Sequence, residues 1–154
     1  AQLEAVAADR SLVANAVEES LRMEPAATLV DRYATRAVDL GGASISVGDL
    51  VTVSLAGANR DPTVFVDPDR FDVSRPNLNL QLAFVRGPHT CLGLHLARLQ
   101  TIAAVEAVLD LVPDARLRDD FQPARGLVFR KPAAVPVTWD PAVESTFPTI
   151  GSPA

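Results

Sequence analysis

The segment 84–93 constrains this chain most, because it places the chain's single cysteine immediately before a helix-forming sequence. No glycine or proline interrupts residues 94–112, so the pattern predicts one long helix that ends at Pro113. A cysteine at the entrance of a helix lies beside free backbone N–H groups and the positive end of the helix dipole, which favour a thiolate. Cys91 is therefore the first candidate for chemistry in this chain.

Four interpretations of Cys91 follow from its neighbours. It could be a nucleophile, with His89 or His95 as the base. It could bind zinc together with both histidines, although a fourth ligand would be needed and no second cysteine exists. It could be the axial thiolate of a haem iron. It could also be an inert core thiol, the usual state of a single cysteine and the one that bare composition favours.

The haem interpretation accounts best for the residues around the cysteine. A flat macrocycle lying against this segment needs residues without bulk, and Gly87 and Gly93 meet that need. Haem propionates need cationic or donor partners, and His89 and Arg32 are available. On the strand pattern alone, the charge of Arg32 is better explained by contact with solvent.

The rest of the chain predicts an α+β class, mainly helical with small β-sheets. Helical periodicity covers 2–8 and 12–23, with Asp9 or Ser11 as the cap of the second helix. The predicted strands are 29–34, 38–40, 44–47, 50–55, 127–130 and 135–139. Gly41-Gly42 predicts a hairpin turn, and 127–130 and 135–139 are predicted to pair. Residues 57–88 show turn chemistry and few regular patterns, which is typical of a long functional loop.

The predicted helix 94–112 is apolar nearly all round, which is typical of a buried helix. Arg98, Glu106 and Asp110 exclude a membrane span. After Pro141 the chain has little to bury, so a flexible tail is expected over 141–154.

The composition of the chain narrows the classes of function and partner that are possible. Of 154 residues, 48% are hydrophobic and the net charge is −5, which fits a globular protein and argues against nucleic-acid or anionic-membrane surfaces. One cysteine forms no internal disulfide, which fits a reducing, cytoplasmic location. The chain begins without Met inside a helical pattern, and we expect it to be a piece of something longer.

Glu19 and Arg22 lie three residues apart on the predicted helix 12–23 and can form an ion pair. Spacing alone favours an exposed pair that contributes less than about 1 kcal/mol.

Several motifs, taken together, resemble the cytochrome P-450 family. The pattern F-x-x-G-x-H-x-C-x-G over 84–93 is similar to that family's haem-binding signature. Glu19-Ser20-Leu21-Arg22 resembles its E-x-x-R helix, and Arg32-Tyr33-Ala34 its strand arginine. Asn59-Arg60-Asp61-Pro62 and Asp67-Pro68-Asp69-Arg70-Phe71 resemble its meander, and Leu96-Ala97-Arg98 the helix after the cysteine. The order of these motifs from about Leu3 to Trp139 also agrees with that family. The sequence most resembles the soluble bacterial branch of the family.

The resemblance implies a fold and a cofactor. Residues 1–140 would be the C-terminal segment of a cytochrome P-450 domain, with its E-x-x-R helix, meander, haem-binding cysteine loop and following buried helix. The cofactor would be haem b (iron protoporphyrin IX), with Cys91 as the iron ligand, the arrangement in which a thiolate favours O–O cleavage. The other implied roles are haem contacts by His89, Arg32, Phe84, Gly87 and Gly93, a buried ionic triad of Glu19, Arg22 and Arg70, and substrate contacts by Ala26, Thr28, Leu29 and Val30.

The resemblance also implies an activity that this chain would not complete. The parent enzyme would be a monooxygenase that inserts one oxygen atom into a small organic substrate, with electrons from a ferredoxin-type donor that Arg86 and Arg98 could meet. The family's oxygen-activating residues, central helix and N-terminal part have no counterpart here, so we assign no catalytic residue and expect no competent turnover. The alternative is a non-catalytic truncated partner or scaffold with weak or no haem binding, which could self-associate over an exposed core.

Two positions depart from the family pattern. Val85 stands where the family usually has Gly or Ser, which predicts either a strained turn or altered packing of the loop. Gln81 stands where related bacterial sequences often have a His near a propionate. Either change could weaken haem retention, and neither removes the ligand.

Overall fold

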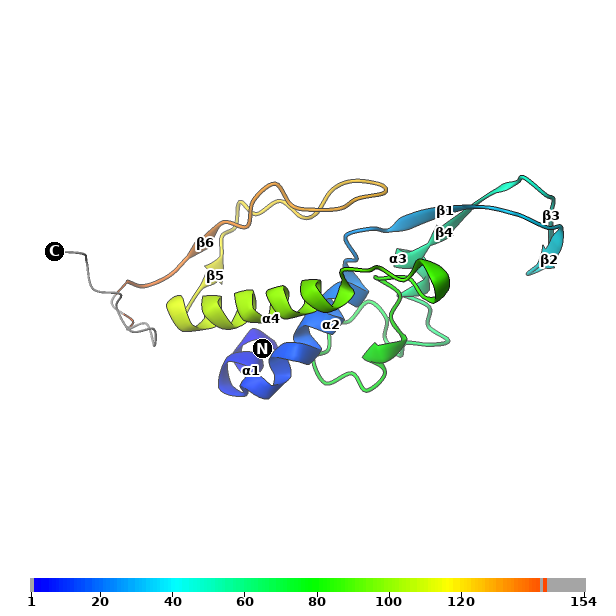
Figure 1. Ribbon diagram of the computed structural model, residues 1–154. Coiled ribbons are helices and arrows are strands. Elements are labelled where there is room, and N and C mark those ends of the chain that lie inside the picture. The colour runs from blue at the N-terminus through cyan, green and yellow to red at the C-terminus, as the bar shows by residue number, and fades with distance from the viewer. Residues whose placement is uncertain (1, 142, 144–154) are drawn as a thin grey trace.

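The computed structural model describes residues 2–141 and 143, and they form a helical body with two extended β arms (Figure 1). The body contains α1 (Gln2–Ala8), the 3₁₀ turn η1 (Arg10–Leu12), α2 (Val13–Met23) and α4 (Leu94–Leu111). Asp9 caps the second helical segment, because its side chain accepts a hydrogen bond from the Ser11 amide at 3.0 Å. The helices predicted from periodicity are therefore confirmed to within a residue or two at their ends.

The first arm is a long ribbon built from two antiparallel pairs. β1 (Leu29–Tyr33) pairs with β4 (Leu50–Ser54), and β2 (Val38–Leu40) pairs with β3 (Ala43–Ile45). Gly41 and Gly42 turn the chain at φ values of 58° and 84°, a conformation that glycine adopts without strain. The hairpin predicted at this dipeptide is confirmed, and its second strand ends two residues earlier than expected.

The second arm corrects a predicted hairpin. β6 (Val137–Thr138) pairs with β5 (Arg116–Leu117), and not with residues 127–130. Phe129 instead forms a bridge with Ala27, so that the loop between β5 and β6 returns to the start of the first arm. The prediction was wrong because residues close in sequence were assumed to pair, whereas long-range contacts decide the partner here.

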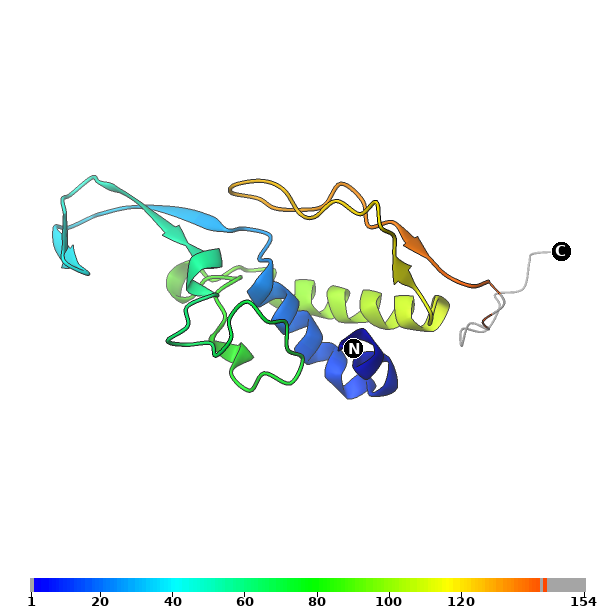
Figure 2. The same ribbon diagram turned by 180° about the vertical axis from the view of Figure 1, so that it is seen from behind.

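The segment after β4 runs alongside α2, as Figure 2 shows from behind, and reaches the N-terminal half of that helix, where Asn15 donates to the Val73 carbonyl. It contains α3 (Leu55–Ala58), η2 (Leu78–Leu80) and η3 (Gly87–His89), and is otherwise irregular, as expected. The main core lies where α1, α2 and α4 meet this segment; its buried members are Val6, Val13, Val73 and Leu109.

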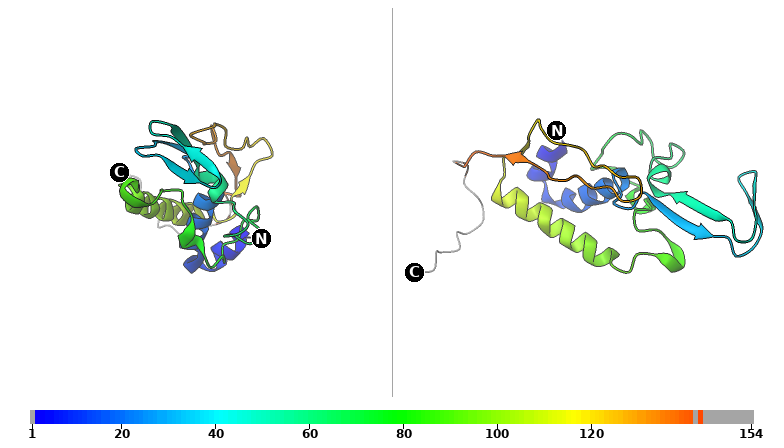
Figure 3. Two further views of the ribbon diagram at one scale, coloured as in Figure 1. Left: turned by 90° about the vertical axis from the view of Figure 1, so that its right-hand side faces the viewer. Right: turned by 90° about the horizontal axis from the view of Figure 1, so that it is seen from above.

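Helix α4 is confirmed in extent but not in burial. Leu109 is its buried residue, while Leu96, Leu99 and Leu111 are more than half exposed. One stripe of the helix packs on α2, and the opposite face has no cover among the described residues (Figure 3). No helix among the described residues is long and apolar enough to span a membrane. The flexible tail predicted for 141–154 lies outside the described residues, apart from Pro141 and Val143.

Candidate functional site

A buried charge cluster anchors α2 to the irregular segment. Arg22 binds Glu19 with both arms of its guanidinium group, Nε to Oε2 at 2.6 Å and Nη2 to Oε1 at 2.8 Å. Neither side chain is exposed to solvent. The Arg75 Nε atom reaches the same carboxylate, 3.2 Å from Oε1, and the Arg75 side chain is 6% exposed. The pair is thus buried, as the resemblance implied, and the expectation of an exposed pair from spacing was wrong.

The third member of the triad is Arg75, and the assignment of Arg70 was wrong. The Arg70 residue is exposed, and it takes part through its backbone carbonyl, which accepts hydrogen bonds from Arg22 Nη2 at 3.3 Å and Arg75 Nη2 at 3.0 Å. The chain turns back after Phe71, so the later arginine enters the cluster. No local signal in the sequence distinguishes the two arginines, because the turn geometry decides which side chain points inward.

The cluster holds Glu19 in its charged form. Burial by itself would raise the pKa of Glu19, but hydrogen bonds from the Arg22 side chain, the Asp72 amide and Arg75 outweigh this effect. The pKa of Glu19 therefore lies below its ordinary value. Because removal of one partner would leave a buried uncompensated charge, the cluster is a strong structural constraint.

The cysteine segment is a short loop that ends on α4. The Cys91 amide donates to the Phe84 carbonyl at 3.0 Å, and the Cys91 carbonyl accepts from Leu94 at 3.3 Å. Between these bonds, Thr90 closes the turn η3 through two hydrogen bonds to the Gly87 carbonyl, from its amide and from its hydroxyl. Backbone contacts therefore set the position of the cysteine.

The face of the loop that carries Cys91 is exposed, and its small residues leave room for a flat group. Cys91 is a free, exposed thiol, and a Cβ atom placed on Gly93 would lie 4.0 Å from its sulfur. A Cβ atom on Gly87 would meet nothing within 4 Å, although the φ of +83° there still favours glycine. An accessible thiol donor at a helix entrance, with a glycine beside it, fits an axial haem ligand.

Two other interpretations of Cys91 lose support. The thiol is exposed, so it is not an inert core residue. Within residues 2–141 and 143, no group of three His, Cys, Asp or Glu side chains is placed to hold a metal ion, so His89, Cys91 and His95 do not form a zinc site.

Val85 has the unusual backbone conformation that its departure from the family pattern predicted. Its φ is 59°, in the left-handed region that β-branched residues rarely enter. Its amide donates to the Leu82 carbonyl at 2.9 Å, which closes the tight turn immediately before the cysteine loop. The sequence difference therefore places strain where the chain enters the candidate site.

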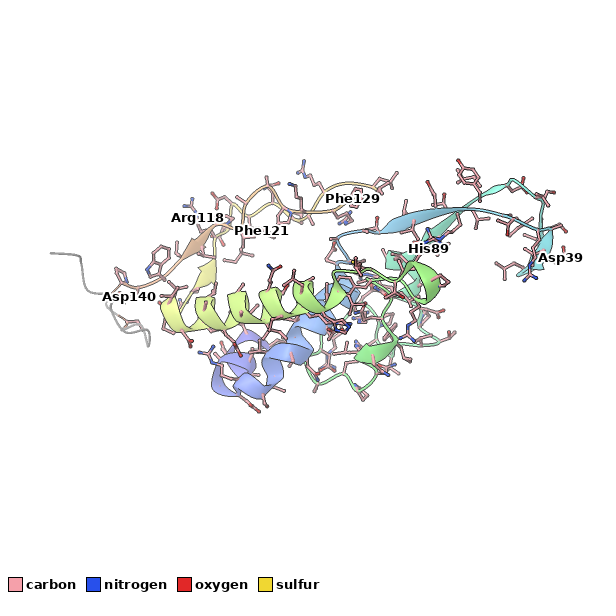
Figure 4. All side chains as sticks on the ribbon, viewed as in Figure 1. Asp39, His89, Arg118, Phe121, Phe129 and Asp140 are labelled. Carbon is pink, nitrogen blue, oxygen red and sulfur yellow. The ribbon has the colours of Figure 1, made fainter. Side chains whose placement is uncertain are left out.

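The residues expected to contact haem propionates come from separate elements. His89 is exposed on the loop at the N-terminal end of α4, the end nearer the first arm (Figure 4). Arg32 lies in β1 opposite Val51, is partly exposed, and donates to its neighbour's carbonyl at 2.7 Å. No contact between the two is described, so their shared role stays a prediction.

The residues expected to face substrate differ in their surroundings. Thr28 is 4% exposed and donates from its hydroxyl to the Leu127 carbonyl. Thr28 and Leu29 line an open pocket of about 350 Å³, which Gly126 and Leu127 of the β5–β6 loop also line. Ala26 is exposed, and Val30 is paired with Val53 in the first arm. Contact with a substrate therefore stays a prediction for all of them.

Sequence reasoning missed two further polar residues. Asn59 is fully buried, and its carbonyl accepts from Arg22 Nη1 at 2.8 Å while its side chain accepts from the Leu82 amide at 2.7 Å. Glu18 binds Arg98, the residue that the family resemblance suggests as a contact for an electron donor. A turn motif contained Asn59, but nothing in it indicated burial.

Comparisons with known proteins identify the family of this chain. The family model described as Cytochrome P450 matches residues 5–111. Cytochrome P450 monooxygenase PikC of Streptomyces venezuelae is 42% identical over 144 residues, which are 90% of this chain and 34% of that protein. The Biotin biosynthesis cytochrome P450 of Bacillus subtilis (strain 168) is 39% identical over 132 residues, 84% of this chain and 33% of that protein.

A solved structure gives the same result. The crystal structure of P450BioI in complex with hexadec-9Z-enoic acid ligated acyl carrier protein matches with a TM-score of 0.85 and 37% identity, over 90% of this chain and 36% of that chain. The chain therefore belongs to the cytochrome P450 family, whose members use haem and include monooxygenases. It spans about a third of the length of the curated relatives it matches.

Proposed function

We propose that this chain forms the haem-thiolate side of a cytochrome P450 monooxygenase, with Cys91 as the axial iron ligand. The observation that carries the proposal is the exposed Cys91 thiol at the entrance of α4, with Gly93 beside its sulfur. The bound haem b would supply dioxygen activation, for insertion of one oxygen atom into a small organic substrate.

The chain's own residues hold and orient this group. Cys91 provides the thiolate, and Gly87 and Gly93 allow the macrocycle to lie close to the loop. His89 and Arg32 would bind the propionates, and Phe84 would pack near the sulfur. The cluster of Glu19, Arg22 and Arg75 supports the loop from behind, because it fixes the irregular segment against α2. Ala26, Thr28, Leu29 and Val30 would lie near the substrate.

Two further parts of the proposal concern the whole enzyme. A ferredoxin-type protein would supply electrons to it in the cytoplasm. We assign no oxygen-activating residue within these 154 residues, and we expect the chain by itself to show no substrate turnover with electron donors supplied. Measured turnover by the purified chain would contradict that expectation.

Carbon-monoxide difference spectroscopy of the reduced, haem-reconstituted chain tests the ligand. We expect a thiolate-type Soret band that Cys91→Ala abolishes. Leu92→Ala is the matched control, because Leu92 is the adjacent residue, is 100% exposed, and offers no ligand. A band that survives Cys91→Ala would overturn the assignment of the ligand.

The second candidate is a non-catalytic partner or scaffold, and the exposed apolar face of α4 favours it. Leu96, Leu99 and Leu111 would then contact another protein or a second copy of this chain. A folded wild-type chain that binds no haem, and that associates in size-exclusion chromatography, would support this candidate over the first.

A further inference from the structure

A second polar cluster joins three segments around the cysteine loop. The Arg98 side chain on α4 binds Glu18 on α2 with two hydrogen bonds, Nε to Oε1 at 2.5 Å and Nη2 to Oε2 at 2.9 Å. Gln81 donates from Nε2 to the same carboxylate, 3.0 Å from Oε2. The side chains of Arg98 and Glu18 are 33% and 21% exposed, so solvent screens this pair only in part.

The cluster reaches the cysteine through Phe84. The Arg98 guanidinium carbon lies 5.3 Å from the centroid of the Phe84 ring, within the range of a cation–π contact. The Phe84 carbonyl in turn accepts the Cys91 amide hydrogen at 3.0 Å. One continuous series of contacts therefore runs from Glu18 through Arg98 and Phe84 to the Cys91 backbone.

The same cluster contacts residues on both sides of the cysteine loop. Gln81 precedes the loop, and its Oε1 atom accepts from the Ala83 amide at 2.6 Å, so Glu18 also holds the segment that leads into Phe84. Arg98 follows the loop on α4. Glu18 thus ties the residues before Cys91 and the helix after it to one point on α2.

We propose that Arg98, oriented by Glu18, is a positioning residue that fixes Phe84 and thereby the Cys91 backbone. Its charge is directed at Glu18 and the Phe84 ring, which gives it a role other than meeting an electron donor. The planar guanidinium group suits this role best, because it makes the bidentate contact and stacks on the ring at once, whereas lysine keeps the charge but makes no bidentate contact. The consequence for the iron ligand rests on the proposed function, while the effect on the loop does not.

Hydrogen exchange of the Cys91 amide in the full chain tests the proposal without haem. We expect Glu18→Gln and Arg98→Ala each to speed this exchange about threefold to tenfold, because a partly exposed bidentate pair is lost. Arg98→Lys should lie between Arg98→Ala and the wild type.

The matched control is Arg10→Gln, which breaks the other described ion pair between α4 and the N-terminal helices, Arg10 to Asp110 at 3.0 Å. This pair lies at the opposite end of α4, so exchange at Cys91 should stay at the wild-type rate. A purely structural role would speed exchange equally along α2 and α4. Such a uniform change, or no change at Cys91, would overturn the proposal.

A spectroscopic measurement extends the test to the loaded chain. We expect Glu18→Gln to lower the thiolate-type fraction of the carbon-monoxide Soret band, and Arg10→Gln to preserve it. If the wild-type chain shows no thiolate band but its variants show the local exchange effect, the proposed function fails and the positioning role stands. If the wild type shows the band and the exchange is unaffected, the positioning role fails and the proposed function stands.

Discussion

The buried charge cluster on α2 and the Cys91 loop before α4 differ sharply in solvent exposure. The cluster of Glu19, Arg22 and Arg75 is closed: its side chains are at most 6% exposed, and Phe65 packs against both arginines. The Cys91 loop is open: the thiol is exposed and the neighbouring Leu92 is 100% exposed.

This difference distinguishes the cluster that stabilises the fold from the loop that carries the candidate iron ligand. The closed cluster is stabilised by contacts that this chain makes with itself, so its contribution should be measurable in the chain's own unfolding. The open loop is positioned by a few backbone bonds and the Glu18–Arg98 pair, so changes there should alter local exposure and ligation more than global stability.

The largest effect is expected at Arg22. Arg22→Ala leaves the Glu19 carboxylate buried without its bidentate partner, which should lower the free energy of unfolding by about 3–5 kcal/mol. Urea unfolding followed by circular dichroism measures this value. Arg118→Ala is the control, because its partner Asp120 is exposed and the loss should stay below about 1 kcal/mol. Equal losses in both variants would contradict the closed cluster.

Arg75 and Arg70 separate the two possible triads. Arg75→Ala should cost about 2–3 kcal/mol of unfolding free energy, because hydrogen bonds to a charged group and to the Val66 and Arg70 carbonyls are lost. Arg70→Ala keeps its backbone carbonyl and should change stability by less than about 0.5 kcal/mol. The same unfolding experiment compares them, and the reverse order would restore Arg70 as the buried member.

Acid should weaken the closed cluster through Glu19. Its pKa in the folded chain lies below the ordinary value of 4.5, so its stabilising contribution is complete above that value and is lost as the pH falls through the lower, folded pKa. Glu19→Gln should therefore be less stable than the wild type at neutral pH and should lose less stability on acidification. Urea unfolding over a pH series checks both, and parallel curves would show that Glu19 does not carry the linkage.

Val85→Gly should stabilise the open loop. Glycine removes the cost of a β-branched residue at a φ of 59°, and after its own entropic penalty the gain should be about 0.5–1 kcal/mol. Val66→Gly is the control, since Val66 is 77% exposed and outside the left-handed region, and it should lose stability. Thermal unfolding compares the two. A loss in Val85→Gly would show that side-chain packing outweighs the backbone cost.

The smallest effect is expected on the uncovered face of α4. Leu99 is 65% exposed, and Leu99→Ala should change the unfolding free energy by less than about 0.5 kcal/mol. Leu109 is 6% exposed on the packed face, and Leu109→Ala should cost about 2–3 kcal/mol. Similar losses at both positions would indicate that the exposed face is covered in solution by self-association.

Local patterns in the sequence predicted most of the elements. Hydrophobic periodicity placed α2 and α4 within a residue or two, and the Gly41-Gly42 pair predicted the turn between β2 and β3. The Val85 departure predicted a strained turn that the backbone shows. These predictions succeed because each depends on the steric preferences of a few neighbouring residues.

The sequence by itself therefore determined the helices, the glycine turn and a cysteine at a helix entrance in a recognisable order of motifs. Tertiary structure alone decided that Arg75 and not Arg70 enters the cluster, that β5 and not residues 127–130 pairs with β6, and that Arg98 is directed at Glu18. It also decided that α4 exposes one apolar face. The reason is physical: local preferences act within a few residues, whereas burial and pairing depend on surfaces that long stretches of chain bring together.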